Sequence, residues 1–292
     1  MAGEAHYSYF VGIDWSGAKG VRHAGIAVAA CRSGRHAPHL IAPPSGRKHW
    51  ARTECADWLT HGAGPDSQAQ TLVGIDASFS TPFVDETSYL GPAFKPENVR
   101  NLWAAVEKIC GDAQDLFGGA FVDRFSEHYL RPGHRGRKYR RRMRVAESQA
   151  VASGAGPCES VFHLIGPSQV GLSGLSTMRM LAELAGDPDI AVWPYDTPAA
   201  QPVTLVEIYA AAFAAMGGHR GKIRCLVDLD KTLQKLGSNS YDGTEEELSD
   251  HACDALVTAA GLRHIAHERK YWYPELLSPM VRRTEGWVFG IL

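Results

Sequence analysis

The sequence predicts an α/β protein built on a mixed β-sheet. Residues 9–42 contain three short β-forming segments separated by turn residues, as in an antiparallel meander. A fourth such segment at 71–78 nearly repeats the first one, after an intervening helical pattern. Strand and helix signals alternate again beyond residue 171. Together these patterns indicate a sheet covered by helices.

The N-terminal elements follow from local composition. The first strand is expected at 9–14, because an apolar run there ends at a turn with two glycines. The second strand is predicted at 21–31 and the third at 39–42, which two prolines terminate. A helix is predicted over 49–61, where bulky apolar residues recur at near-helical spacing up to Gly62.

The first and fourth strands end in matching motifs. Val11-Gly12-Ile13-Asp14 and Val73-Gly74-Ile75-Asp76 are nearly continuous apolar runs, which is typical of strands buried on both faces. Open α/β sheets bind ligands beyond the carboxyl ends of such strands. If the two strands are parallel neighbours, they lie about 4.8 Å apart and bring Asp14 beside Asp76.

The later part of the chain begins with a large insertion after the fourth strand, at about 83–170. The insertion contains a helix expected at 96–110 and a helical stretch ending at 152. The elements predicted after it are a helix at 172–184, strands at 190–194 and 203–209, a short helix at 228–236 and a long last helix beginning near Thr244.

The last helix brings further ionisable groups. Thr244 and Glu247 form a capping-box pattern, and an alanine-rich apolar face follows. His251 and Asp254 border that face three residues apart. Asp250 fits best as part of the acidic first turn, whereas Asp254 has less structural reason to be there.

A helix packed over the two strands would complete a triangle of Asp14, Asp76 and Asp254. Partly buried carboxylates cannot all ionise without a compensating cation, and Mg²⁺ or Mn²⁺ is the expected one. A pair of such ions roughly 4 Å apart activates water on one side of a phosphodiester and stabilises the leaving oxygen on the other. The expected chemistry is two-metal hydrolysis by direct water attack.

A basic segment at 131–144 points to the substrate. It contains eight Lys or Arg and no acid, while the whole chain has a formal charge of −2. Such a block suits a phosphate backbone, and Tyr139 offers a stacking face. A solvated, partly disordered loop is the alternative. The predicted nucleic-acid contacts are Arg135, Arg137, Lys138, Arg140, Arg141 and Arg142.

Length and composition exclude other classes. The 292 residues are 45% hydrophobic and 21% charged, as in a globular protein, and are treated as one domain, 1–292. No apolar run reaches the roughly 20 residues of a membrane span, and no signal peptide is evident. Six widely spaced cysteines indicate neither a zinc site nor a disulfide scaffold, so a cytoplasmic protein is expected. The sequence does not define the oligomeric state and is compatible with a dimer.

Element order and motifs resemble the ribonuclease H-like superfamily, particularly RuvC-type resolvases and bacterial uncharacterised nucleases of that fold. The motifs are the two Val-Gly-Ile-Asp segments and His251-Ala252-Cys253-Asp254-Ala255-Leu256. The resemblance implies a mixed five-stranded sheet of order 3-2-1-4-5, helices on both faces and a Mg²⁺-dependent nuclease. It implies catalytic roles for Asp14, Asp76, His251 and Asp254, and a similar role for Glu207.

Two other functions share parts of this pattern. Actin-like and sugar-kinase proteins also end their first strand in Asp followed by a small polar phosphate loop, as in Asp14-Trp15-Ser16-Gly17. Alternatively, the chain is a nucleic-acid-binding module without catalysis, in which the arginine-rich segment binds and the aspartates are structural.

Overall fold

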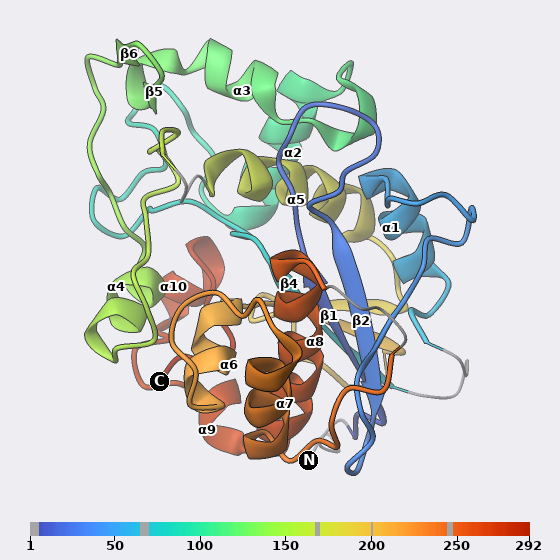
Figure 1. Ribbon diagram of the computed structural model, residues 1–292. Coiled ribbons are helices and arrows are strands. Elements are labelled where there is room, and N and C mark those ends of the chain that lie inside the picture. Colours follow the sequence, from blue (N-terminus) through green and yellow to red (C-terminus); the bar gives the residue numbers. More distant parts are fainter. Residues whose placement is uncertain (1–5, 65–69, 167–169, 200, 244–247) are drawn as a thin grey trace.

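The computed structural model describes residues 6–64, 70–166, 170–199, 201–243 and 248–292. Their main feature is a mixed six-stranded sheet of order β3-β2-β1-β4-β8-β7 (Figure 1). Strand β1 is antiparallel to β2 and parallel to β4, and β8 is parallel to both β4 and β7. The strands are β1 Tyr9–Asp14, β2 Ala27–Arg32, β3 His39–Leu40, β4 Thr71–Asp76, β7 Ile190–Trp193 and β8 Val203–Glu207.

The α/β class and the order of the first four strands are as predicted, but the five-stranded order 3-2-1-4-5 is wrong. The described sheet has a sixth strand, because β7 lies at the edge outside β8 although it precedes β8 in the chain. The second strand is also shorter than predicted and begins at Ala27. Before it, His23 forms an isolated bridge with Trp50 instead of joining the sheet.

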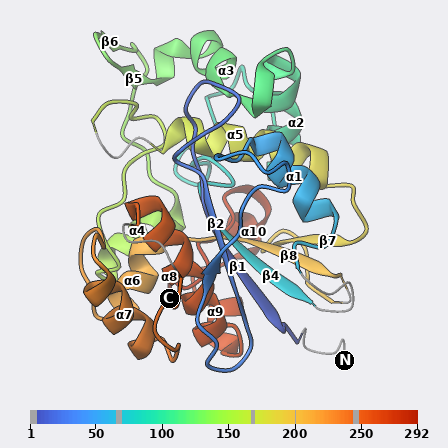
Figure 2. The same cartoon turned by 45° about the vertical axis from the view of Figure 1, so that its right-hand side comes forward.

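Helices cover both faces of the sheet (Figure 2). One face is covered by α1 (Arg52–Thr60) and α5 (Gly171–Leu184), and α2 (Val99–Cys110) packs against α5. The other face is covered by α8 (Asp250–Ile265), with α6 (Ala210–Met216) and α7 (Leu226–Lys235) packed against α8.

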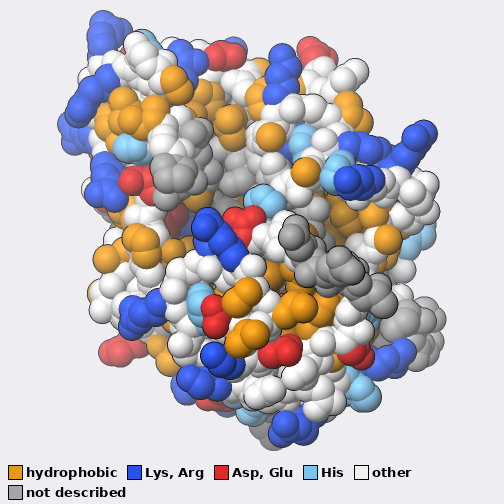
Figure 3. All heavy atoms as spheres, in the orientation of Figure 1, with side chains coloured by type: hydrophobic (Ala, Val, Ile, Leu, Met, Phe, Trp, Pro, Cys, Tyr) orange, Lys and Arg blue, Asp and Glu red, His pale blue; other side chains and the backbone are white. Residues whose placement is uncertain are grey.

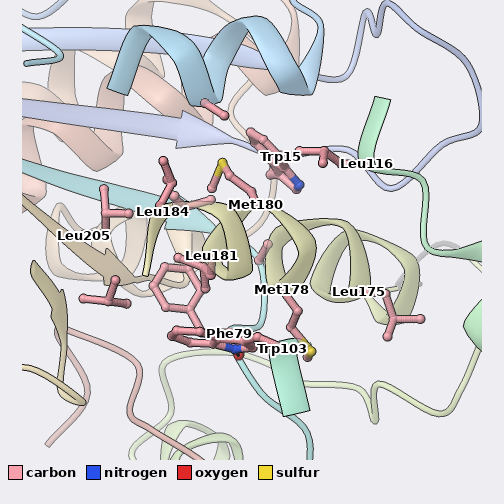
Figure 4. Close-up of a cluster of buried hydrophobic side chains, with 14 of the residues drawn as sticks. Trp15, Phe79, Trp103, Leu116, Leu175, Met178, Met180, Leu181, Leu184 and Leu205 are labelled. Carbon is pink, nitrogen blue, oxygen red and sulfur yellow. Dashed lines mark hydrogen bonds between the residues drawn. The ribbon is translucent and has the colours of Figure 1, made fainter. Parts of the chain in front are cut away.

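Helix α5 is buried because its apolar side chains face the sheet on one side and the insertion on the other. Figure 4 shows Met178 beside Trp103 and Phe79, while Met180 points toward Trp15. The indole of Trp103 donates a hydrogen bond to the backbone oxygen of Phe79 at 2.7 Å. The chain after β4 is therefore fixed against this layer.

The insertion between β4 and α5 is largely ordered secondary structure. Besides α2 it contains the short helical turns η1 (Gln114–Leu116) and η2 (Ser126–His128), α3 (Gly119–Arg124), the hairpin β5 (Leu130–Arg131) with β6 (His134–Arg135), and α4 (Val145–Ala152). Pro132 and Gly133 form the hairpin turn, and Gly133 takes the positive φ of +71° that a turn of this type favours in glycine.

The C-terminal segment closes the α8 side of the sheet with two short helices, α9 (Arg269–Trp272) and α10 (Pro279–Thr284). After them, Trp287 and Phe289 are buried against the core. In the described part of the chain, no helix has the length and apolar character needed to cross a membrane.

The start of α8 differs from the prediction. The helix begins at Asp250, because the hydroxyl of Ser249 caps it by accepting a hydrogen bond from Ala252 N–H at 3.1 Å. Leu248 lies outside the helix. The capping pattern predicted at Thr244 and Glu247 lies outside the described residues.

Glycines in the two repeated motifs let α8 approach the sheet. A Cβ added at Gly12 would lie 2.3 Å from the backbone oxygen of Ala255, and one at Gly74 would lie 2.9 Å from the side chain of Leu262. At Gly12 the backbone of α8, at Ala255 and Ala259, comes unusually close to the strand, whereas the neighbours of Gly74 are the side chains of Ile208 and Leu262. This close contact holds the N-terminal half of α8 over the ends of β1 and β4.

We expect Gly12→Ala to lower the free energy of unfolding by about 2–3 kcal/mol, because the added methyl forces the two backbones apart. Urea denaturation measures the change. Gly186→Ala is the matched control, since a Cβ there would meet nothing within 4 Å. Equal stability of the two variants would contradict the packing described.

Candidate active site

Three carboxylates approach one another at the carboxyl ends of β1 and β4. Asp14 and Asp76 are direct partners in the parallel register of these strands, so their backbones lie about 4.8 Å apart. Asp254 comes from the second turn of α8, on the face of the sheet toward which Gly12 and Gly74 point. Because strand side chains alternate, Asp14 and Asp76 point to that same face.

His251 is bound to Asp14. Its Nδ1 lies 2.6 Å from Asp14 Oδ2, and its Nε2 lies 3.9 Å from Asp250 Oδ1. The hydrogen bond to Asp14 raises the pKa of His251, against the opposing effect of burial, and the charge of Asp250 adds to the increase. A protonated His251 therefore compensates part of the negative charge.

Asp254 is bound by a residue that the sequence analysis missed. Lys222 Nζ lies 2.5 Å from Asp254 Oδ2. Lys222 belongs to the loop between α6 and α7. The basic residues at 219–224 could have indicated a partner for an acidic site, but nothing in the sequence placed their loop beside α8. Burial raises the pKa of Asp254, and the contact with Lys222 only partly offsets this effect.

Of the carboxyl groups at this site, Asp76 has the most strongly raised pKa. Burial raises its pKa well above the ordinary value of 3.8, and the charges of Asp14 and Asp254 raise it further. A hydrogen bond from the Ala210 backbone and the charge of Lys222 oppose this increase. A carboxylate in this setting costs stability when ionised, which is typical of residues retained for function.

The donor chemistry of the site fits a hard divalent cation, although the acids are already engaged. No three His, Cys, Asp or Glu side chains stand as a metal-binding cluster within the described ranges. Instead, His251 and Lys222 bind Asp14 and Asp254. A divalent ion would have to replace these two contacts, and in exchange it would relieve the repulsion at Asp76.

Glu207, predicted as a further catalytic acid, is not brought to these carboxylates. It shares a face of β8 with Leu205, in the core on the α5 side, whereas Val206 points to the α8 side. Its carboxylate forms a buried ion pair with Arg144 and accepts a 2.8 Å hydrogen bond from Phe79 N–H. Glu207 therefore fixes the chain that follows Asp76, and the structure gives it a supporting role.

Arg142, predicted to contact nucleic acid, also has a structural place. Its guanidinium is buried and binds both carboxylate oxygens of Asp85, at 2.8 and 2.5 Å. It also donates to the backbone oxygens of Pro82, Ser88 and Tyr89. The donors of Arg142 are thus used inside the insertion, so we withdraw it from the predicted nucleic-acid contacts.

The other basic residues of the segment remain on the surface. Lys and Arg side chains gather over β5 and β6 at the upper left of Figure 3, while acidic, basic and His side chains lie together near the middle of that face. Lys138 pairs with Glu127 at 2.7 Å and Arg141 with Glu159 at 2.7 Å. Arg137 and Arg140 lie 3.5 Å from Glu127 and Glu86, and Arg135 stacks over Tyr139. Exposed pairs of this kind are weak, so a polyanion can displace the carboxylates.

No family model matches the chain, and no significant match was found among curated proteins or solved structures.

Proposed function

We propose that the chain is a metal-dependent nuclease with a ribonuclease H-like core. The observation that supports this most is the alignment of Asp14 and Asp76 on adjacent parallel strands, with Asp254 on the helix that crosses them. The strand order β3-β2-β1-β4, with β8 parallel beyond it, agrees with this proposal.

Asp14, Asp76 and Asp254 are the residues that would hold Mg²⁺ or Mn²⁺. When bound by carboxylates, such ions lower the pKa of a water nucleophile and stabilise the charge on a leaving oxygen. A cation beside Asp76 would favour its ionised form, because burial and the charges of Asp14 and Asp254 raise the pKa of this carboxyl.

His251 and Lys222 would act on the substrate once the acids release them. The side chains of both residues are about half exposed, 42% for His251 and 53% for Lys222. The protonated His251 can donate its Nε2 proton to a leaving oxygen, and Lys222 can pair with a phosphate oxygen. His251 would stay close to Asp14, and Lys222 close to Asp254.

The exposed basic residues of the insertion supply the expected partner. The surface segment presents five cations, four of which pair only weakly with acidic side chains, while the fifth, Arg135, stacks over Tyr139. The four are Arg137, Lys138, Arg140 and Arg141. Such a segment favours binding to nucleic-acid phosphates without regard to base sequence. The proposed substrate is therefore DNA or RNA.

A cleavage panel tests the proposal. Single-stranded, duplex, hybrid and branched DNA and RNA are incubated with Mg²⁺ or Mn²⁺ and the parent chain, Asp14→Asn or Asp57→Asn. Asp57 is an exposed acid of α1 and serves as the matched control. We expect the parent and Asp57→Asn to cleave at least one substrate, EDTA to stop cleavage and Asp14→Asn to be inactive. Cleavage by Asp14→Asn at the parent rate, or none by the parent, would contradict the proposal.

We expect the combined change of Arg137, Lys138 and Arg140 to Gln to weaken nucleic-acid binding and flatten its salt dependence. Each lost phosphate contact should lower the slope of log K against log salt by about one. Fluorescence anisotropy in EDTA between low and moderate salt measures this slope. The control is the combined change of the exposed residues Arg35, Arg47 and Lys48 to Gln. If both triple variants lose the same nucleic-acid affinity, the basic segment has no specific role in binding.

A further inference from the structure

A cavity lies at the other end of the sheet from the carboxylates. Its volume is about 610 Å³, and its walls include Phe10 at the start of β1 and Ala266 just after α8. Ala266 is twelve residues beyond Asp254, which corresponds to about 18 Å along a helix. The cavity is therefore separate from the candidate active site, and its size is in the range of small-molecule sites.

Aromatic rings form one wall of this cavity. Tyr7 and Trp272 are stacked with ring centroids 5.8 Å apart and planes inclined by 13°. Trp193 meets Trp272 edge-on at 5.8 Å. The Trp272 indole donates to the backbone oxygen of Ala266 at 2.7 Å, and Tyr7 O–H donates to Thr204 at 3.0 Å. The rings are thus held in place before any ligand binds.

Three arginines line the same cavity. Arg263 is held by the backbone oxygen of His36 at 2.6 Å and by Ser238, and Arg282 by the backbone oxygen of Pro194 at 2.8 Å. Arg269 lies over the ring of Tyr273. None of the three forms an ion pair with an acidic side chain in the part of the chain that the structure describes. The lining acid Asp196 is instead paired with Arg100 at 2.6 Å.

We propose that this cavity binds a nucleoside monophosphate. Guanidinium groups without an acidic partner favour binding of an anion, and their planar donors match phosphate oxygens. Aromatic rings that are already fixed in place favour stacking of a planar ring, such as a nucleobase. A nucleotide combines both parts in a molecule that the cavity can hold. The inference does not depend on the nuclease proposal, because it uses none of the carboxylates.

Isothermal titration of the full chain with AMP, GMP, CMP and UMP in EDTA tests the inference. Adenosine and inorganic phosphate serve as half-ligand probes. We expect one saturable site for at least one nucleotide with a Kd below about 1 mM, and binding at least about tenfold weaker for each half-ligand.

Variants locate the site. Arg269→Gln combined with Arg282→Gln should weaken binding at least about tenfold, while Arg283→Gln, one residue outside the lining, should leave it unchanged. Arg269 is exposed, so Arg269→Gln alone decides the question if the double variant does not fold, and a measurable loss is then expected. Asp76→Asn should bind as the parent does. The inference is overturned by the absence of saturable binding, by equal binding of adenosine, by no effect of the arginine changes, or by loss of binding in Asp76→Asn.

Discussion

Asp76→Asn is expected to abolish cleavage while making the metal-free protein more stable. Loss of a cation-binding carboxylate removes several kcal/mol of transition-state stabilisation, so the rate should fall at least about 10³-fold. The same substitution removes a charge that burial and two neighbouring acids disfavour. The free energy of unfolding should therefore rise at neutral pH, because the raised pKa makes ionisation of this carboxyl unfavourable in the folded state and the amide carries no such charge.

The sign of the pH dependence follows from the raised pKa of Asp76. Below the ordinary value of 3.8 the carboxyl is protonated in both the folded and unfolded states, so Asp and Asn should be equally stable. As the pH rises from that value through the folded pKa, only the parent loses stability. Urea unfolding in EDTA between pH 4 and 8 should therefore show a growing advantage for Asp76→Asn.

Asp57→Asn is again the control, because Asp57 is exposed on α1, away from the three carboxylates, and its change should leave activity unaltered. An Asp76→Asn variant that is less stable than the parent at pH 8 would show that the carboxylate has a structural purpose. If Asp76→Asn cleaves at the parent rate, the Asp76 carboxylate takes no part in catalysis.

Glu207→Gln is expected to destabilise the protein by about 3 kcal/mol, the lower end of the cost of breaking a buried ion pair, because Arg144 keeps a second carboxylate partner. The Arg144 side chain is only 1% exposed, and Glu147 remains as its other partner at 2.9 Å. Burial opposes the charge of Arg144, but the carboxylates of Glu207 and Glu147 outweigh this effect and hold the Arg144 pKa well above its usual value. Urea denaturation measures the loss.

Glu268→Gln is the matched control for Glu207→Gln. Glu268 pairs with Lys270 at 2.7 Å on the surface, so its change should cost less than about 1 kcal/mol. If Glu207→Gln instead has the stability of the parent and fails to bind divalent ions, Glu207 belongs to the cation site and its structural role is wrong.

The sheet and the convergence of the carboxylates could be predicted because they depend on local patterns. The Val-Gly-Ile-Asp repeat specifies two buried strands ending in Asp, and the structure adds a reason for the repeated glycine. Gly12 faces the backbone of α8, where a larger residue would block the approach of the helix, and Gly74 leaves room for the side chains of Ile208 and Leu262. Helical spacing predicted only that His251 and Asp254 border the same face of their helix.

The partners of the charged residues could not be predicted, because they come from distant parts of the chain. Lys222 meets Asp254, 32 residues later, through a loop whose position the sequence does not define. Arg142 looks like any other arginine of its basic segment, yet contacts 53 to 60 residues away bury it. Glu207 is separated from the aspartates by the sheet, because strand alternation turns it toward the opposite face.

Calorimetric titration with Mn²⁺ tests the central claim most directly. We expect the parent and Asp57→Asn to bind Mn²⁺ saturably, and both Asp14→Asn and Asp76→Asn to bind at least about tenfold more weakly. Equal Mn²⁺ binding by all four proteins, or no saturable binding by the parent, would contradict the account.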